Sequence, residues 1–223
     1  MIPCELHVHT IMSDGIITCT TLVRQAMRRH INIVCITDHN TLPSSQFIDR
    51  VISMSRGRVL PIPGIEISTP IGHILIIGVD IRDRKILRIR NPAILLEYCN
   101  ENSYFTIAPH PFDPIRRGVF LHIGELKINA IEAINGRSNI LSNMIALWYA
   151  TKNNIPYVCG SDAHIPQELG KALTYIDAEM EAEAVIDGLF RQRYFAPVRQ
   201  YIGKITNFLP IGEKILTRFI RRR

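Results

Sequence analysis

Two histidines near the start of the chain, His7 and His9, lie one residue apart in an apolar run. Because side chains alternate along an extended segment, both imidazoles point to the same side and can bind one metal ion. Asp14 follows in a Ser-Asp-Gly sequence, which predicts a turn just beyond the strand. The histidine pair alone is a weak indication of a metal site, since two core histidines beside a surface turn give the same pattern.

The same kinds of side chain recur wherever later apolar runs begin or end. In chain order they are Asp38, His39, Glu66, His73, His110, Asp162 and His164. Glu66 stands between isoleucines, where a buried carboxylate is unfavourable unless it is paired, protonated or bound to a cation. The alternative for Glu66 is an exposed face of an edge strand, and for His73 a hydrogen-bonded core histidine. Six of the eight histidines, together with three carboxylates, therefore indicate a metal site more strongly than any one motif.

The helices and strands that carry these side chains determine where they lie. Apolar runs alternate with amphipathic stretches along most of the chain. The pattern predicts strands at residues 4–10, 31–40, 59–69, 72–81, 104–111, 129–136 and 155–164. It predicts helices at residues 18–30, 43–57, 91–103, 138–154 and 179–193. Repeated strand–helix units predict an α/β domain with parallel strands. Active sites of parallel α/β barrels lie at the carboxyl ends of the strands, so we expect the polar side chains to share one pocket.

The composition is that of an ordinary globular domain: of 223 residues, 47 % are hydrophobic and 21 % are charged. The apolar stretches are interrupted too early to span a bilayer, and the first residues resemble no secretion signal. Five cysteines occur without paired spacing, which favours reduced thiols over disulfides. We therefore expect a cytoplasmic protein.

The basic character of the chain is concentrated in its last residues. Residues 203–223 contain six basic side chains and one acidic side chain, a net charge of +5 out of the +6 of the whole chain. Ile211, Ile215 and Phe219 recur at helical spacing, so this tail is predicted to be a basic amphipathic helix that follows a domain at residues 1–202. It can pack on the domain with a solvated basic end, lie on an acidic membrane surface, or contact nucleic acid.

The ordered series HVH, SDG, TDHN, GIEIS, GH, APHP and GSDAH resembles the motif series of the PHP (polymerase and histidinol phosphatase) family. The resemblance extends from His7 to His164 and implies a distorted, TIM-like (β/α)7 barrel that holds up to three divalent metals. It implies a first metal bound by His7, His9, Glu66 and Asp162, a second by Glu66, His73 and His110, and a third by Asp14, His39 and His164. Every ligand position carries the expected residue type, which predicts an active member of the family.

One departure from the family concerns the segment between the GH and HP motifs. Members that degrade nucleotides and RNA typically insert a sizeable subdomain there, whereas this chain has only residues 74–109. The chain therefore resembles a minimal PHP domain, with a more open cleft than those members have.

A mixed set of nitrogen and oxygen ligands suits Mn, Zn or Fe better than Ca or Mg. Three such ions carry more charge than the three carboxylates, so the site is expected to attract phosphate. The ions would lower the pKa of a bound water toward ~7 and so provide the nucleophile. Asp38 is the candidate to support a ligand by a hydrogen bond or to assist the leaving group, unless it only starts a helix. Arg137, Arg116 and Arg117 are candidates to bind phosphate.

These inferences predict a metal-dependent phosphoesterase that acts on a phosphomonoester or on a nucleotide or nucleic-acid phosphodiester. A metal-dependent amidohydrolase is an alternative, although it usually requires a bridging lysine and no lysine is suitably placed. A metal-stabilised binding module without catalytic activity, recruited through the basic tail, is the third possibility. The sequence does not predict an oligomeric state.

Overall fold

The computed structural model describes residues 1–198 and residue 201, so the predicted helix at residues 203–223 lies outside the described residues. The strands are β1 (Ile2–Glu5), β2 (Ile33–Ile36), β3 (Leu60–Thr69), β4 (Gly72–Ile77), β5 (Phe105–Ala108), β6 (Ala130–Asn135), β7 (Tyr157–Gly160), β8 (Thr174–Ile176) and β9 (Tyr194–Phe195). The α-helices are α1 (Cys19–Arg28), α2 (Ser45–Ser55), α3 (Pro92–Glu101), α4 (Ile140–Lys152) and α5 (Ala182–Phe190). Two short 3₁₀ helices are η1 (Ile86–Arg88) and η2 (Phe120–Gly124).

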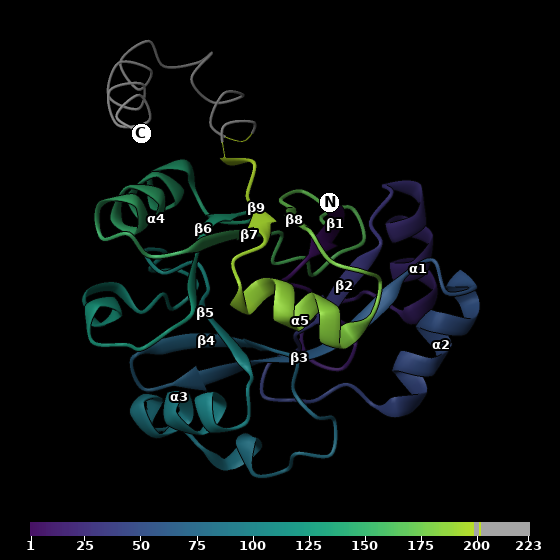
Figure 1. Ribbon diagram of the computed structural model, residues 1–223, viewed down its shortest axis with the longest axis horizontal. Coiled ribbons are helices and arrows are strands. Elements are labelled where there is room, and N and C mark those ends of the chain that lie inside the picture. Colours follow the sequence, from purple (N-terminus) through teal and green to yellow (C-terminus); the bar gives the residue numbers. More distant parts are fainter. Residues whose placement is uncertain (199–200, 202–223) are drawn as a thin grey trace.

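The strands form one curled sheet in the order β7-β6-β5-β4-β3-β2-β1-β8-β9, with helices packed around it (Figure 1). β1, β2 and β3 are parallel, and so are β5, β6 and β7. The segments that follow β1 and β7 also pair with each other: the His9 amide donates to the Ala163 carbonyl (2.8 Å) and the Ala163 amide donates to the His7 carbonyl (3.1 Å). The fold is therefore a mixed α/β, nearly closed, barrel-like sheet, which confirms the predicted distorted TIM-like barrel.

Two features depart from a regular succession of parallel strands. β3 and β4 form a hairpin, and β4 is antiparallel to both β3 and β5. This reversal brings His73, at the start of β4, to the end of the barrel where the parallel strands finish. β8 and β9 were not predicted, because strands of three and two residues are too short to show an alternating pattern.

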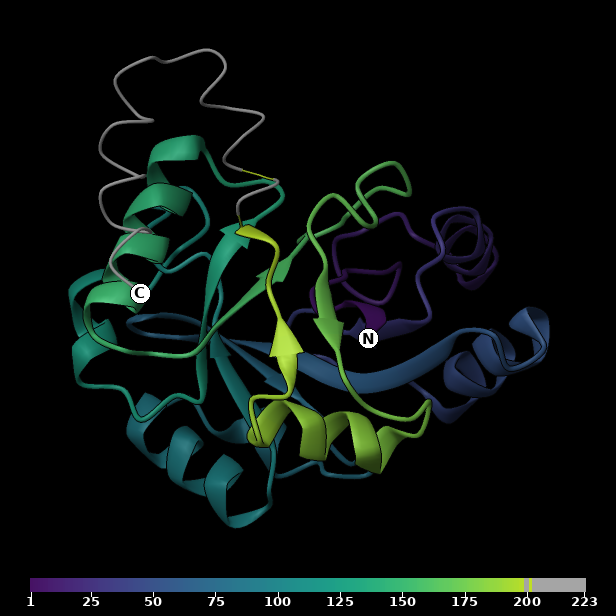
Figure 2. The ribbon, with the colours of Figure 1, turned by 45° about the horizontal axis from the view of Figure 1, so that its top comes forward.

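The other end of the barrel is covered by α5, which lies below the sheet in Figure 2. Val185 and Leu189 on α5 belong to the same buried cluster as Leu75 and Phe105 on the strands. Gly78, just after β4, has space only for its hydrogens there, since a Cβ atom would lie 2.8 Å from the Ile186 side chain. The open end of the barrel is thus the one where the predicted metal ligands are found.

Four of the five α-helices described, α1 to α4, begin at a residue whose side chain caps the first turn. The Thr18 hydroxyl accepts the Thr21 amide at the start of α1, Ser44 caps α2 in the same way, and Asn91 caps α3 ahead of Pro92. Within the described part of the chain, no helix is long and apolar enough to cross a membrane. All five cysteines are free and buried.

Candidate metal centre

Glu66 lies at the middle of a cluster of imidazoles at the open end of the barrel. Its side chain is 1 % exposed, so its charge must be balanced by neighbouring groups. The distances to its carboxylate oxygens are 3.3 Å from His7 Nε2, 3.1 Å from His9 Nε2, 3.4 Å from His39 Nδ1, 3.0 Å from His73 Nδ1 and 3.1 Å from His110 Nε2. Five of the six predicted histidine ligands therefore contact one carboxylate.

The sheet explains why residues so far apart in sequence meet at Glu66. β3 continues beyond its neighbour β2, and Glu66 pairs with His39 in an isolated parallel bridge. Across the β3–β4 hairpin, Ser68 is opposite His73, which places the His73 ring beside Glu66. β3 is a central strand, so the alternative of an exposed carboxylate on an edge strand is wrong.

Asp162 completes a first group with His7 and His9. Its Oδ1 lies 3.7 Å from His7 Nε2 and 3.5 Å from His9 Nε2. The backbone of Asp162 adopts a left-handed conformation (φ 53°), which turns its side chain into the barrel just after β7. Left-handed residues other than glycine are uncommon, although aspartate tolerates the conformation better than most.

Asp14 and His164 lie at the solvent-facing side of the cluster. Asp14 Oδ2 is 3.1 Å from His164 Nε2 and 3.8 Å from His39 Nε2, and Asp14 Oδ1 is 3.6 Å from His9 Nδ1. The Asp14 side chain is 55 % exposed, in contrast to the buried Glu66. The centre is therefore open to water and to a substrate on the side of Asp14.

The nine predicted ligands thus surround one region of space, and seven of them form groups that could hold a metal ion. Among the described residues, three sets have ligand atoms within 4.8 Å of one another: His7, His9 and Glu66; His39, Glu66 and His73; and His9, Asp14, His39 and His164. Two atoms that each lie about 2.1 Å from a common ion are about 3.0–3.4 Å apart, as the atoms around Glu66 are. His9 and His39 each belong to two sets, whereas the family resemblance assigned each of them to one.

A second observation concerns the ring nitrogens. His9 Nδ1, His39 Nδ1, His73 Nδ1 and His110 Nδ1 are buried and have no hydrogen-bond partner among the described residues. His39 Nδ1 and His73 Nδ1 are close to Glu66 but do not meet hydrogen-bond geometry with it. Buried polar atoms without partners are rare in proteins, and a bound cation would give a partner to those that face the cluster.

The electrostatics of the cluster also favours a bound cation. Burial disfavours charge on Glu66, yet His7, His110 and His73 hold the pKa of its carboxyl well below the ordinary value. Burial likewise opposes charge on His7, but Glu132, Asp162 and Glu66 raise the pKa of its imidazole well above the ordinary value. At His39, burial lowers the pKa to about 4, so this ring is neutral at physiological pH and has a free lone pair. The carboxylates thus draw positive charge into the cluster.

Glu132 on β6 was missed by the sequence analysis and holds two of the predicted ligands. It is 1 % exposed, its Oε1 accepts from His7 Nδ1 (3.1 Å), and its Oε2 accepts from the His110 amide (2.8 Å). Asn135 Nδ2 also donates to Oε2 (2.9 Å). A Cβ atom at Gly160 would collide with this carboxylate, so glycine is required where β7 passes it. The signal was a lone carboxylate in an apolar strand, the same signal that identified Glu66.

Asp38 holds the loop that carries Asp14. Its Oδ1 accepts from the Thr10 amide (2.7 Å) and the Ser13 hydroxyl (2.6 Å), and its Oδ2 accepts from the Thr10 hydroxyl (2.7 Å). Asp38 does not start a helix, because Ser44 caps α2. Both of its oxygens are engaged within the protein, so its observed role is to fix the loop between β1 and α1.

Glu5 is a further buried carboxylate that the sequence analysis did not single out. It accepts backbone N–H groups of Ser161 (2.9 Å), Gly170 (2.9 Å) and His7 (3.3 Å). Burial raises its pKa to about 7 against the opposing effect of these hydrogen bonds. Glu5 therefore ties β1 to the segment that follows β7, next to the centre.

The three predicted phosphate-binding arginines differ in position. Arg116 is held by Asp113 (Nη1–Oδ2 3.0 Å), and its buried Nε lies 3.4 Å from Asp162 Oδ2 without a hydrogen-bond partner among the described residues. Arg137 Nη1 lies 2.6 Å from His164 Nδ1. Arg117 is exposed and contributes its carbonyl, which accepts the His73 amide (3.1 Å). Arg116 and Arg137 are therefore at the rim of the centre, and Arg117 supports it through the backbone.

Comparisons with known proteins agree with the family resemblance of the sequence motifs. The family model described as PHP domain matches residues 5–117, and the model described as PHP-associated matches residues 141–193. The 5′-3′ exoribonuclease Rnm of Salmonella typhimurium is 42 % identical over 65 residues, which make up 29 % of this chain and 22 % of the exoribonuclease.

Two solved structures share the fold. A two-domain protein from Bacteroides vulgatus that contains a predicted PHP-like metal-dependent phosphoesterase superposes with a TM-score of 0.70 at 19 % identity, covering 86 % of this chain and 63 % of that one. The lesion-specific endonuclease PfuEndoQ of Pyrococcus furiosus superposes with a TM-score of 0.63 at 17 % identity, covering 85 % of this chain and 56 % of that one. The chain thus spans less than two thirds of either solved protein.

Proposed function

The chain belongs to the PHP family, and on that premise we propose that it is a metal-dependent phosphoesterase that hydrolyses phosphodiester bonds of nucleic acid or nucleotides. The observation that carries the proposal is the buried Glu66 carboxylate, which is surrounded by imidazole nitrogens at the separations expected around divalent ions. The exoribonuclease and the endonuclease, both of which act on nucleic acid by name, favour a nucleic-acid substrate over a small phosphomonoester.

We assign the ligands to three positions for Mn, Zn or Fe. His7, His9, Glu66 and Asp162 form the first; Glu66, His73 and His110 form the second; Asp14, His39 and His164 form the third. His39 contacts both Glu66 and Asp14, which supports a location for it between the proposed second and third positions. Bound ions supply a water of lowered pKa and neutralise charge on the phosphoryl oxygens.

The residues of the chain prepare the rest of the reaction. Glu132 accepts the Nδ1 proton of His7, which leaves His7 Nε2 directed at the centre. Asp38 holds the loop of Asp14 at the solvent-facing side, where a substrate enters. The free Nε–H of Arg116, beside Asp162, is placed to donate to a phosphate oxygen, and Arg137 contributes a second cation at the rim.

The test is a cleavage assay on the purified full chain loaded in turn with Mn²⁺, Zn²⁺ or Fe²⁺. The substrates are bis-p-nitrophenyl phosphate, p-nitrophenyl phosphate, and short RNA and DNA strands with a 5′ phosphate. We expect metal-dependent cleavage of the diester and of at least one oligonucleotide. His9→Ala should lower the rate by at least about a thousandfold, since His9 contacts both Glu66 and Asp14.

The matched control is His122→Ala, because His122 is 51 % exposed and lies outside the cluster. Its cleavage rate should equal that of the wild type. Turnover of the monoester alone would assign the chain to phosphomonoester hydrolysis. Absence of any cleavage by the metal-loaded protein, or an unchanged rate in a folded His9→Ala variant, would contradict the proposal.

A further inference from the structure

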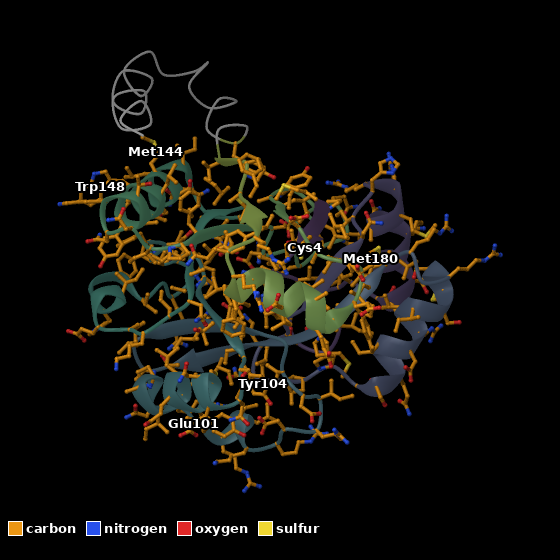
Figure 3. The ribbon with its side chains drawn as sticks, in the orientation of Figure 1. Cys4, Glu101, Tyr104, Met144, Trp148 and Met180 are labelled. Carbon is orange, nitrogen blue, oxygen red and sulfur yellow. The ribbon has the colours of Figure 1, made fainter. Side chains whose placement is uncertain are left out.

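An exposed apolar stripe runs along α4, away from the metal centre. Leu141, Ile145 and Trp148 follow one another at i, i+4 and i+7, so they lie on one side of the helix. Their side chains are 64 %, 36 % and 42 % exposed. Figure 3 shows Trp148, with Met144 near it, at the outer edge of the molecule. Three large apolar side chains aligned on one helix form a patch of the kind that a partner usually covers.

The described chain ends beside this helix. Val198 and Tyr201 pack in one buried cluster with Leu147, the residue of α4 that precedes Trp148. The Tyr201 hydroxyl accepts the Leu173 amide (2.8 Å), which fixes the ring against the barrel. Tyr201, the last residue that the structure describes, therefore lies next to α4.

The sequence that follows Tyr201 is suited to cover the stripe. We propose that residues 211–220 dock as an amphipathic helix on Leu141, Ile145 and Trp148 of the same chain. Ile211, Ile215 and Phe219 form one row at i, i+4 spacing, and rows of this spacing interdigitate when two helices pack. The ten residues from Tyr201 to Ile211 can span up to about 33 Å, whereas the thirteen residues of α4 are about 20 Å long. The connection is long enough to reach the whole stripe.

Charge indicates that this contact is apolar and leaves the basic side chains in solvent. α4 contains no acidic residue, and its Lys152 ammonium already lies over the Trp148 ring (4.8 Å to the centroid). α4 therefore offers no acidic partner to Lys214, Arg218 or the last three arginines. Docking should therefore be insensitive to salt, whereas binding of the basic residues to an anionic surface would weaken as salt rises.

Trp148 is the one tryptophan in the sequence, so its fluorescence reports on the stripe directly. The experiment measures its emission maximum and acrylamide quenching in the full-length protein. Ile215→Asp places a charge in the proposed contact, and Thr217→Asp adds the same charge about half a turn away. Because Ile215→Asp would remove the proposed cover from the ring, it should shift the emission to the red and raise the quenching constant above that of the wild type. Thr217→Asp should match the wild type at low and at high salt.

Several outcomes would overturn this inference. Equal quenching in the wild type, Ile215→Asp and Thr217→Asp would show that the tail does not cover the ring. Protection that disappears on dilution would assign the stripe to a second copy of the chain, and protection that requires anionic vesicles would assign it to a membrane. Phe219→Asp provides a second disruption in the same row, and far-ultraviolet circular dichroism confirms that each variant is folded.

Discussion

Glu132→Gln is the most informative substitution in the centre, because a neutral amide of the same shape cannot replace the carboxylate. Both oxygens of Glu132 are acceptors: Oε1 for His7 Nδ1, and Oε2 for the His110 amide and Asn135 Nδ2. A glutamine has one oxygen and one NH₂ group. If its NH₂ faces His110, two donors meet; if it faces His7, the imidazole must move its proton to Nε2. With its proton on Nε2, His7 has no lone pair on the side of Glu66 with which to bind a metal ion.

We expect Glu132→Gln to weaken metal binding about 10- to 100-fold, the usual effect of losing a group that orients a metal ligand. This corresponds to about 1.4–2.7 kcal/mol of binding free energy. The assay is calorimetric titration of the metal-free protein with Mn²⁺ or Zn²⁺, with bound metal counted by elemental analysis. Unfolding in urea separates loss of affinity from loss of the fold.

The matched control is Glu125→Gln, which makes the same change on a side chain that is 80 % exposed. It should bind metal like the wild type. A folded Glu132→Gln protein with unchanged affinity and unchanged metal content would refute the reasoning, because His7 would then not depend on Glu132 for its orientation.

Three further predictions concern the surroundings of the centre. Between pH 4.5 and 7 the folded chain binds more protons at Glu5 than the unfolded chain, so this group lowers stability by up to ~3 kcal/mol as pH rises. Glu5→Gln should lack that loss, and parallel slopes of unfolding free energy against pH would contradict the prediction. Arg116→Lys should lower kcat/KM about tenfold in steady-state assays, because lysine lacks the Nε–H group that is proposed to donate to phosphate. Arg117→Ala, a change at an exposed side chain, should have a smaller effect. Equal kcat/KM values for the wild type and both variants would count against a role of Arg116 in phosphate binding. Gly160→Ala should destabilise the chain by ~1–3 kcal/mol in urea because its methyl group meets Glu132 and His7, whereas a change below about 0.5 kcal/mol would show that β7 can shift.

Helices and strands could be predicted where the residues that define them are close together in sequence. The five α-helices lie within the predicted stretches, because amphipathic spacing is a signal between residues only a few positions apart. Six of the seven longer strands also lie within the predicted apolar runs. β1 (Ile2–Glu5) is the exception: it starts and ends earlier than the predicted strand at residues 4–10, so His7 and His9 lie just beyond β1 rather than on it. The antiparallel direction of β4 was not predictable, since strand direction depends on pairing across the sheet and leaves no periodic signal.

The residues of the metal centre also differ in how far the sequence could predict them. The motif series identified the residues that the structure brings together, and their roles as ligands stay predictions. The groups that hold these residues were missed because their contacts are distant in sequence: Glu132 and His7 are 125 residues apart, and Glu5 and Ser161 are 156 apart. A carboxylate in a strand reveals that it needs a partner but not which partner it has. Asp38 was singled out, but its hydrogen bonds to Thr10 and Ser13 could not be read from spacing.

The β3–β4 hairpin sets an order in which the centre can assemble as the chain folds. Glu66 and His73 belong to one hairpin, so bringing them together closes only a short loop of chain and costs little entropy. Joining His7 to Glu132 requires most of the barrel to be in place, since 125 residues separate them. Contacts of long range form late in folding, after local ones. Glu66 and His73 can therefore meet while the barrel is still open, whereas the whole centre can form only after the ends of β1 and β7 have met.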